Sequence, residues 1–201
     1  MCIRDSIKNI FVTTSIGKAL FTKLVKVDEF TVTFFASIET NYNQEPGFYS
    51  INVTAMSNST TVSSEVILEY LPLTAFTIDT DIIKFPKSFP GSTVESIGDK
   101  NFSTRDNATI INIGNVPIDI LLSATELSNG KDAIPLSNVV YSFDKDFSSE
   151  FSGILSKNLE TINLGLDVDE TRELSFRIVI PKNVTKGDYL GSIMLIAVPS
   201  K

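Results

Sequence analysis

Apolar residues that recur at every second position are the feature that most constrains the fold of this chain. Six runs carry it: 30–38, 49–55, 66–70, 116–122, 174–180 and 189–197. Successive side chains of a β-strand point to opposite faces of the sheet, so each run predicts a strand with one buried face and one exposed face. The chain is therefore expected to be built from short, half-buried strands.

Clusters of turn-forming residues separate these runs, for example Pro90-Gly91-Ser92 and Ser128-Asn129-Gly130. Short strands punctuated in this way are typical of antiparallel β-sandwiches. Helix formers without strict alternation occur at 16–26, which is ambiguous between helix and strand, and 146–155 is interpreted as a loop or a single turn. The sequence predicts an all-β fold.

The apolar pattern is interrupted at Pro72, which cannot donate a hydrogen bond to a neighbouring strand. We place a domain boundary there, with an N-terminal β domain at 7–72 and a C-terminal sandwich at 73–201. A Gly-x-Tyr step near each domain end, at Gly47 and at Gly187, is expected to open a final strand. The sequence thus predicts tandem antiparallel immunoglobulin-like sandwiches, and the shorter first domain is open to interpretation as part of a truncated one.

The first six residues, Met1–Ser6, resemble translated sequencing adapter more than protein. If they are non-native, the only cysteine of the chain, Cys2, belongs to them, and the authentic N-terminus with any export signal is missing. The remainder would then hold no thiol for a disulfide or a metal site. The alternative is a genuine N-terminus with an ordinary cysteine.

Composition excludes several classes of partner. The 201 residues are 42% hydrophobic and 20% charged, which is an ordinary globular balance, and the net charge is −7 with no run of lysine or arginine. Binding to nucleic acid or to an anionic membrane depends on such runs, so neither partner is expected. No stretch reaches the roughly 18 to 20 apolar residues that span a bilayer, and no signal peptide is recognised.

The segment Asn112-Ile113-Gly114-Asn115-Val116-Pro117-Ile118-Asp119-Ile120 is interpreted as a β-turn that joins two strands of a sandwich. Together with 134–142, 176–178 and 187–191, it resembles a C-terminal immunoglobulin-like domain of archaeal surface proteins, and the resemblance covers roughly 82–198. It implies that 85–91 leads into the sandwich and that the Asn-Gly-Asn turn holds two strands together. Lys186-Gly187 departs from the Pro-Gly that is common in the family. The resemblance brings no catalytic residues.

Histidine is absent from the sequence, which removes the commonest general base and the commonest ligand of transition metals. Three Asp-x-Asp pairs could supply oxygen ligands to calcium: Asp79 with Asp81, Asp144 with Asp146, and Asp167 with Asp169. None lies in a recognisable calcium loop, and acidic surface turns are the favoured interpretation. Asp144 and Asp146 are the first candidates, whereas alternation places Asp167 and Asp169 on one exposed strand face. No enzyme activity and no cofactor are expected.

Asn-x-Ser/Thr sequons, the acceptors of N-linked glycans, are another feature of the chain. They occur at Asn52, Asn58, Asn101, Asn107 and Asn183. Asn52 is expected to point to solvent from its strand, and Asn58, Asn101 and Asn107 fall in predicted turns where a glycan is tolerated. Two interpretations stand side by side: true glycosylation, or the Asn, Ser and Thr content of any turn and exposed strand.

The function expected from these observations is that of a non-catalytic structural or adhesion module of an exported cell-surface protein, acting as a spacer or an interaction domain outside the cell. The alternative is a module that binds a glycan or a protein through loops at one end of the C-terminal sandwich. Those loops are 127–136 and 142–157, the two longest irregular segments.

Overall fold

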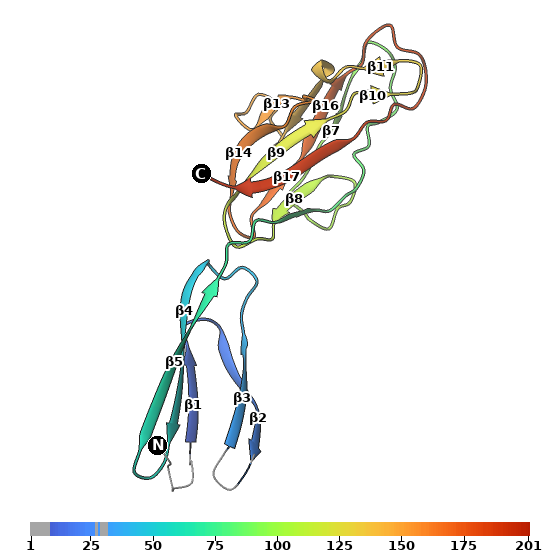
Figure 1. The fold of residues 1–201 in the computed structure, drawn as a ribbon. Coiled ribbons are helices and arrows are strands. Elements are labelled where there is room, and N and C mark those ends of the chain that lie inside the picture. Colours follow the sequence, from blue (N-terminus) through green and yellow to red (C-terminus); the bar gives the residue numbers. More distant parts are fainter. Residues whose placement is uncertain (1–8, 27, 29–31) are drawn as a thin grey trace. The chain divides into compact units, whose positions relative to one another are not determined.

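The computed structural model of the chain describes residues 9–26, 28 and 32–201 (Figure 1). Its strands pair only in antiparallel fashion, and the one helical segment among the described residues is a three-residue 3₁₀ turn. The predicted all-β, sandwich-like class is confirmed. The adapter-like residues Met1–Ser6, and the first two residues of the 30–38 run, lie outside the described residues.

The chain divides into two compact units, Met1–Pro72 and Leu73–Lys201, at the step where Pro72 interrupts the apolar pattern. The strands of the first unit are β1 (Asn9–Thr14), β2 (Lys18–Lys26), β3 (Val32–Glu39), β4 (Gly47–Met56) and β5 (Thr61–Tyr70). They form a three-stranded sheet in the order β1-β4-β5 and a separate β2-β3 hairpin.

The helical alternative for 16–26 is wrong, because this segment forms β2. Its register against β3 shifts between Phe21 and Lys23, and a bulge of this kind breaks the alternation by which a strand is recognised. Gly17, at φ 60°, makes the tight link from β1 to β2. Gly47 was expected to open the final strand of its domain. It does open a strand, β4, but this strand is not the final one, because β5 follows it.

The first unit buries little. Ile16 is the only buried apolar side chain among its described residues. On β5, Val66 and Leu68 are 57% and 39% exposed, so the buried face predicted for 66–70 is wrong. The reason is position: β5 is an edge strand of its sheet, and none of the described elements covers its apolar side chains.

The second unit is the larger one. Its strands are β6 (Phe76–Ile78), β7 (Thr93–Ser96), β8 (Thr109–Asn112), β9 (Ile118–Ala124), β10 (Leu127–Ser128), β11 (Ala133–Ile134), β12 (Val139–Ser142), β13 (Ser152–Ile154), β14 (Glu160–Leu166), β15 (Thr171–Glu173), β16 (Ser175–Val179) and β17 (Ile193–Pro199), and the 3₁₀ turn η1 covers Leu136–Asn138. Their sheets have the orders β13-β12-β16-β7, β14-β9-β17, β15-β8-β6 and β10-β11.

The core of this unit lies between the sheets. β9 contributes Ile118, Ile120 and Leu122 to it. Leu174, just before β16, and Phe176 and Ile178 of β16 face the same core, and all six side chains are at most 4% exposed. The alternation predicted in 116–122 and 174–180 therefore marks the buried faces correctly. In 189–197 the same pattern is only half-buried, because β17 is an edge strand.

The segment 113–117 connects β8 to β9, which belong to different sheets, so this corner crosses between sheets instead of closing a hairpin. Asn112 is fully buried and fastens it. Its amide donates to the carbonyl oxygens of Val116 and Leu166, each at 2.9 Å, and its side-chain oxygen accepts from the Gly114 N–H at 2.8 Å. One asparagine thereby joins β8, the corner and the end of β14.

Three expectations about loops need correction. Gly187 and Tyr189 do not open the final strand; they lie in the loop before β17, where Leu190 forms an isolated bridge with Ser128. The segment 127–136 contains the β10-β11 hairpin, and 142–157 contains β13, so neither is irregular throughout.

None of the helical structure in the described part of the chain is long enough and apolar enough to cross a membrane.

Candidate functional site

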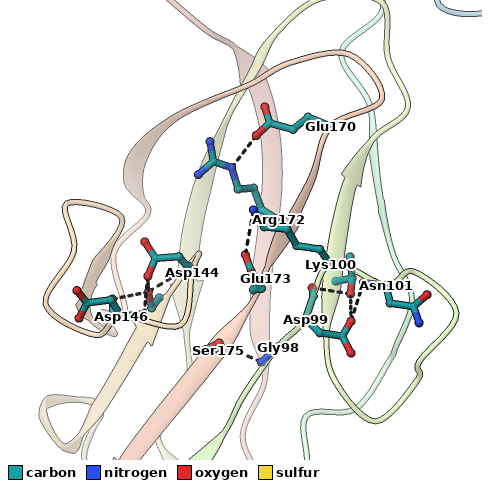
Figure 2. Close-up of polar contacts among 12 residues, drawn as sticks. Gly98, Asp99, Lys100, Asn101, Asp144, Asp146, Glu170, Arg172, Glu173 and Ser175 are labelled. Carbon is teal, nitrogen blue, oxygen red and sulfur yellow. Dashed lines mark hydrogen bonds and ion pairs between the residues drawn. The ribbon is translucent and has the colours of Figure 1, made fainter.

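Asp99 organises the most extensive polar cluster of the second unit, in the loop that leads from β7 to β8 (Figure 2). Its Oδ1 accepts from the Asn101 N–H at 2.8 Å and lies 3.0 Å from the Thr109 hydroxyl. Its Oδ2 accepts from the Thr104 hydroxyl at 2.7 Å and from the Asn107 amide at 3.1 Å. The carboxylate thus ties together a loop that contains two sequons.

These hydrogen bonds stabilise the charged form of the carboxylate. The bond from the Thr104 hydroxyl is the largest cause, partial burial opposes it, and the bonds from Asn101, Asn107 and Thr109 add to it, so the pKa of Asp99 falls from 3.8 to about 2. A pKa lowered in the folded state means that the charge of Asp99 stabilises the fold above pH 3.8. That contribution is lost as the pH falls toward 2.

Replacing Asp99 with asparagine is expected to destabilise the second unit by roughly 1 kcal/mol at pH 7, less than the full pKa shift implies because solvent screens this carboxylate. Urea unfolding at pH 7, 4 and 2, followed by circular dichroism, measures it. The difference between wild type and Asp99→Asn should shrink between pH 4 and pH 2, where the wild-type carboxylate takes up its proton. A difference of the same size at all three pH values would contradict the assignment.

Glu173 lies close to this loop but is buried. It is 8% exposed, and its Oε2 has no hydrogen-bond donor among the described residues. Its ion-pair partner is the Lys100 ammonium group, 3.9 Å from Oε2, as Figure 2 shows. Lys100 is itself mostly exposed. A buried carboxylate next to a cation in this way forms an ion pair whose partner reduces the cost of burying the charge.

The calcium candidates Asp144 and Asp146 lie together in the turn after β12, away from Asp99 in Figure 2. Asp144 Oδ1 accepts from the Ser142 hydroxyl at 3.0 Å and from the Asp146 N–H at 2.6 Å. Asp146 Oδ1 accepts from the Ser148 hydroxyl at 2.6 Å and from its N–H at 2.9 Å. The Ser148 hydroxyl is the main cause of a lowered pKa of Asp146. Both carboxylates therefore hold their own turn in shape.

The other two Asp-x-Asp pairs are separated by their surroundings. Asp79 accepts from the Thr109 N–H at 2.8 Å, whereas Asp81 is exposed. The alternation predicted that Asp167 and Asp169 share an exposed strand face, and this is wrong. Both lie in the turn between β14 and β15, where Asp169 has a φ of 62°. No group of three potential metal-ligating side chains occurs in the described part of the chain.

The sequon asparagines differ in their surroundings. Asn58, Asn101, Asn107 and Asn183 are exposed in loops and turns, as expected for the first three. Asn52 lies in the middle of β4, opposite Thr13 of β1 and Glu65 of β5, and is half-buried instead of fully exposed. The reason is that β4 is the central strand of its sheet.

Two sequons also differ in the hydrogen bonding of the side-chain amide nitrogen that would carry a glycan. Asn107 donates from that amide to Asp99. Asn101 instead uses its side-chain oxygen, which accepts from the Ser103 N–H at 3.2 Å and from the Ser103 hydroxyl at 2.5 Å. In Figure 2 the Asn101 side chain points away from Asp99. A glycan at Asn101 would therefore leave the Asp99 cluster intact.

A shallow, open depression occurs in the second unit between the β10-β11 hairpin region and the loop that precedes β17. It is lined by Asp132, Ala133, Pro135, Asn138, Pro181, Asn183 and Val184. The Thr185 N–H donates to Asp132 Oδ2 at 2.8 Å and fastens one loop to the other. Hydrogen bonds from Thr185 are the main cause of a lowered pKa of Asp132.

Sequence reasoning did not single out Asp99, Asp132 or Glu173. A local signal existed only for Asp99, because an Asp in a loop often accepts a hydrogen bond from the backbone N–H two residues on, here that of Asn101. The partners of Asp132 and Glu173 come from distant segments. Comparison of the sequence with known protein families and with curated proteins gives no significant match.

Proposed function

We propose that this chain is a non-catalytic module of an exported cell-surface protein, in which its units act as a spacer or as an interaction domain. The observation that carries the proposal is the internal use of loop carboxylates. Asp99, Asp132 and Asp146 each accept hydrogen bonds from their own loop or a neighbouring one. Carboxylates engaged in this way shape loops, and they offer no paired acid and base for a reaction.

A location outside the cell is part of the same proposal. Four sequon asparagines are exposed in loops, where a bulky glycan is tolerated. The core of the second unit is built mainly from aliphatic and aromatic side chains, with buried polar groups such as Asn112 beside them, and burial of this apolar surface can drive folding without a disulfide or a metal ion. Such a sandwich is suited to an extracellular array of repeated modules.

Pulling on the whole chain in an optical trap tests the spacer role. A spacer must resist extension, so the second unit is expected to unfold in one cooperative step. Its 129 residues, Leu73–Lys201, correspond to a contour length of roughly 43 to 46 nm, from which the folded end-to-end distance is subtracted. Gradual extension without a discrete step would contradict the spacer role while leaving the binding role open.

The depression lined by Asn138, Asn183 and Val184 favours a second candidate function, the binding of a glycan or a protein through loops. Binding of the chain to an immobilised panel of oligosaccharides tests it. Val184→Arg, which fills the depression, is expected to abolish binding, whereas Ile82→Arg at an exposed site of the same unit is expected to leave it unchanged. Binding that survives Val184→Arg would exclude this surface.

A further inference from the structure

The outer edge of β5 is an open sheet edge. β5 pairs with β4 over ten residues, from Thr61 to Tyr70, without a shift in register. Its other edge has no strand partner among the described residues. Natural proteins protect such edges with short strands, prolines, charged side chains or bulges, and of these β5 has only the charges of Glu65 and Glu69. By contrast, the edge strand β17 of the second unit is shorter and ends at Pro199.

One face of β5 is apolar and uncovered. Val62, Val66 and Leu68 lie on this face and are 45%, 57% and 39% exposed. Their partners across β4 are Ala55, Ile51 and Tyr49, so the row continues an apolar face that is half-buried over β4. A strand added at the edge of β5 would extend this face and remove the exposed row from water.

The opposite face of β5 carries negative charge. Glu65 and Glu69 lie there, four residues apart, opposite Asn52 and Phe48 of β4. Neither glutamate forms an ion pair within the described part of the chain. The next strand position outward is therefore the place where cationic side chains would meet both carboxylates.

These charges argue against a second copy of β5 as the occupant. Antiparallel self-pairing that keeps the apolar faces together and pairs most of the strand can be centred on Ser64, Glu65, Val66 or Ile67. The registers centred on Glu65 and Ile67 set glutamate directly opposite glutamate, and those centred on Ser64 and Val66 place glutamates of the two copies diagonal to each other, about 7–8 Å apart. Like charges repel in all four registers, so the edge favours a basic partner strand.

We propose that β5 is a strand-addition site for an extended segment of another polypeptide, apolar on one face and carrying lysine or arginine at two positions four residues apart on the other. Main-chain hydrogen bonds to the open edge supply affinity, and the two charge pairs with Glu65 and Glu69 supply selectivity. The site stands independently of the spacer role, because it depends only on the first unit.

A fluorescent ten-residue peptide tests this site on the full chain. The peptide has valines opposite Val62, Val66 and Leu68 and lysines opposite Glu65 and Glu69, and its control has glutamates in place of the lysines. Saturable binding in fluorescence anisotropy is expected, with slower hydrogen exchange of β5 amides. The control peptide should bind about two- to thirty-fold more weakly, as expected for the loss of two cross-strand charge pairs.

Protein variants separate the two elements of the site. The double variant Glu65→Lys, Glu69→Lys should reverse the preference between the peptides. Val66→Lys should weaken binding of the lysine peptide, whereas Ile82→Lys, at an equally exposed apolar site of the second unit, should not. Equal affinity for both peptides, protection that maps to β17, or dimerisation of the chain through β5 in the absence of peptide would each overturn the proposal.

Discussion

Replacing Asn112 with alanine is expected to lower the free energy of unfolding of the second unit by about 3 to 5 kcal/mol. Asn112 is fully buried, and its side chain forms three hydrogen bonds with backbone groups of Gly114, Val116 and Leu166. Alanine leaves these groups without their partner in a region closed to solvent, at a cost of about 1 to 3 kcal/mol for each group that stays unsatisfied. Urea unfolding, followed by circular dichroism, measures the loss.

Asn158→Ala is the matched control, because Asn158 is exposed in the same unit and only its backbone N–H forms a hydrogen bond. Its effect should stay within about 0.5 kcal/mol. Asn112→Asp is a second test, since it keeps the acceptor for Gly114 but replaces the amide donor with a carboxylate oxygen facing two carbonyls. If Asn112→Ala were no more destabilising than Asn158→Ala, the corner would not depend on this side chain.

Replacing Phe143 with alanine is expected to destabilise the same unit by about 3 to 5 kcal/mol. Phe143 is fully buried, and its ring meets that of Tyr141 edge to face, with the ring centres 6.0 Å apart. The variant loses the transfer free energy of the ring and leaves a cavity that close-packed neighbours fill only in part. Chemical denaturation measures this loss of unfolding free energy, and an unchanged slope of the transition with denaturant concentration would show that unfolding is still cooperative.

Phe89→Ala provides the comparison for this variant, because Phe89 is 73% exposed in the same unit. Its effect should be within about 0.5 kcal/mol. Phe143→Leu should recover part of the loss, since leucine restores most of the apolar volume. Equal destabilisation by Phe143→Ala and Phe89→Ala would place Phe143 outside the cooperative core.

The fold could be predicted from the sequence where the alternation is uninterrupted. In β9 and β16, every second residue is apolar and buried, and the side chains face the same core. The prediction failed where a bulge or an edge intervenes. β2 was ambiguous because its register shifts between Phe21 and Lys23, and β5 has the expected pattern without the expected burial. Alternation reports which residues could be buried, and the neighbouring elements decide whether they are.

The polar clusters were harder to predict, for a related reason. The turn at Asp144 and Asp146 is fastened by residues two positions apart, so its formation follows from local sequence. The Asp99 cluster also requires Thr104 and Thr109, which reach the carboxylate only because the loop folds back on itself. Glu173 of β15 meets Lys100 of the loop that precedes β8, and no spacing in the sequence predicts that pair.

The pairing order of the strands also determines when each unit can form during translation. The β4-β5 hairpin closes between residues such as Thr54 and Ser63, nine positions apart. In the second unit, Glu95 of β7 meets Arg177 of β16, 82 positions away, and β9 receives its partner β17 only near the C-terminus. A nascent chain halted before Ile193 would already have its N-terminal hairpins while β9 still lacks one neighbour. Chaperones acting on the ribosome would therefore encounter an unfinished sandwich until β17 has been synthesised.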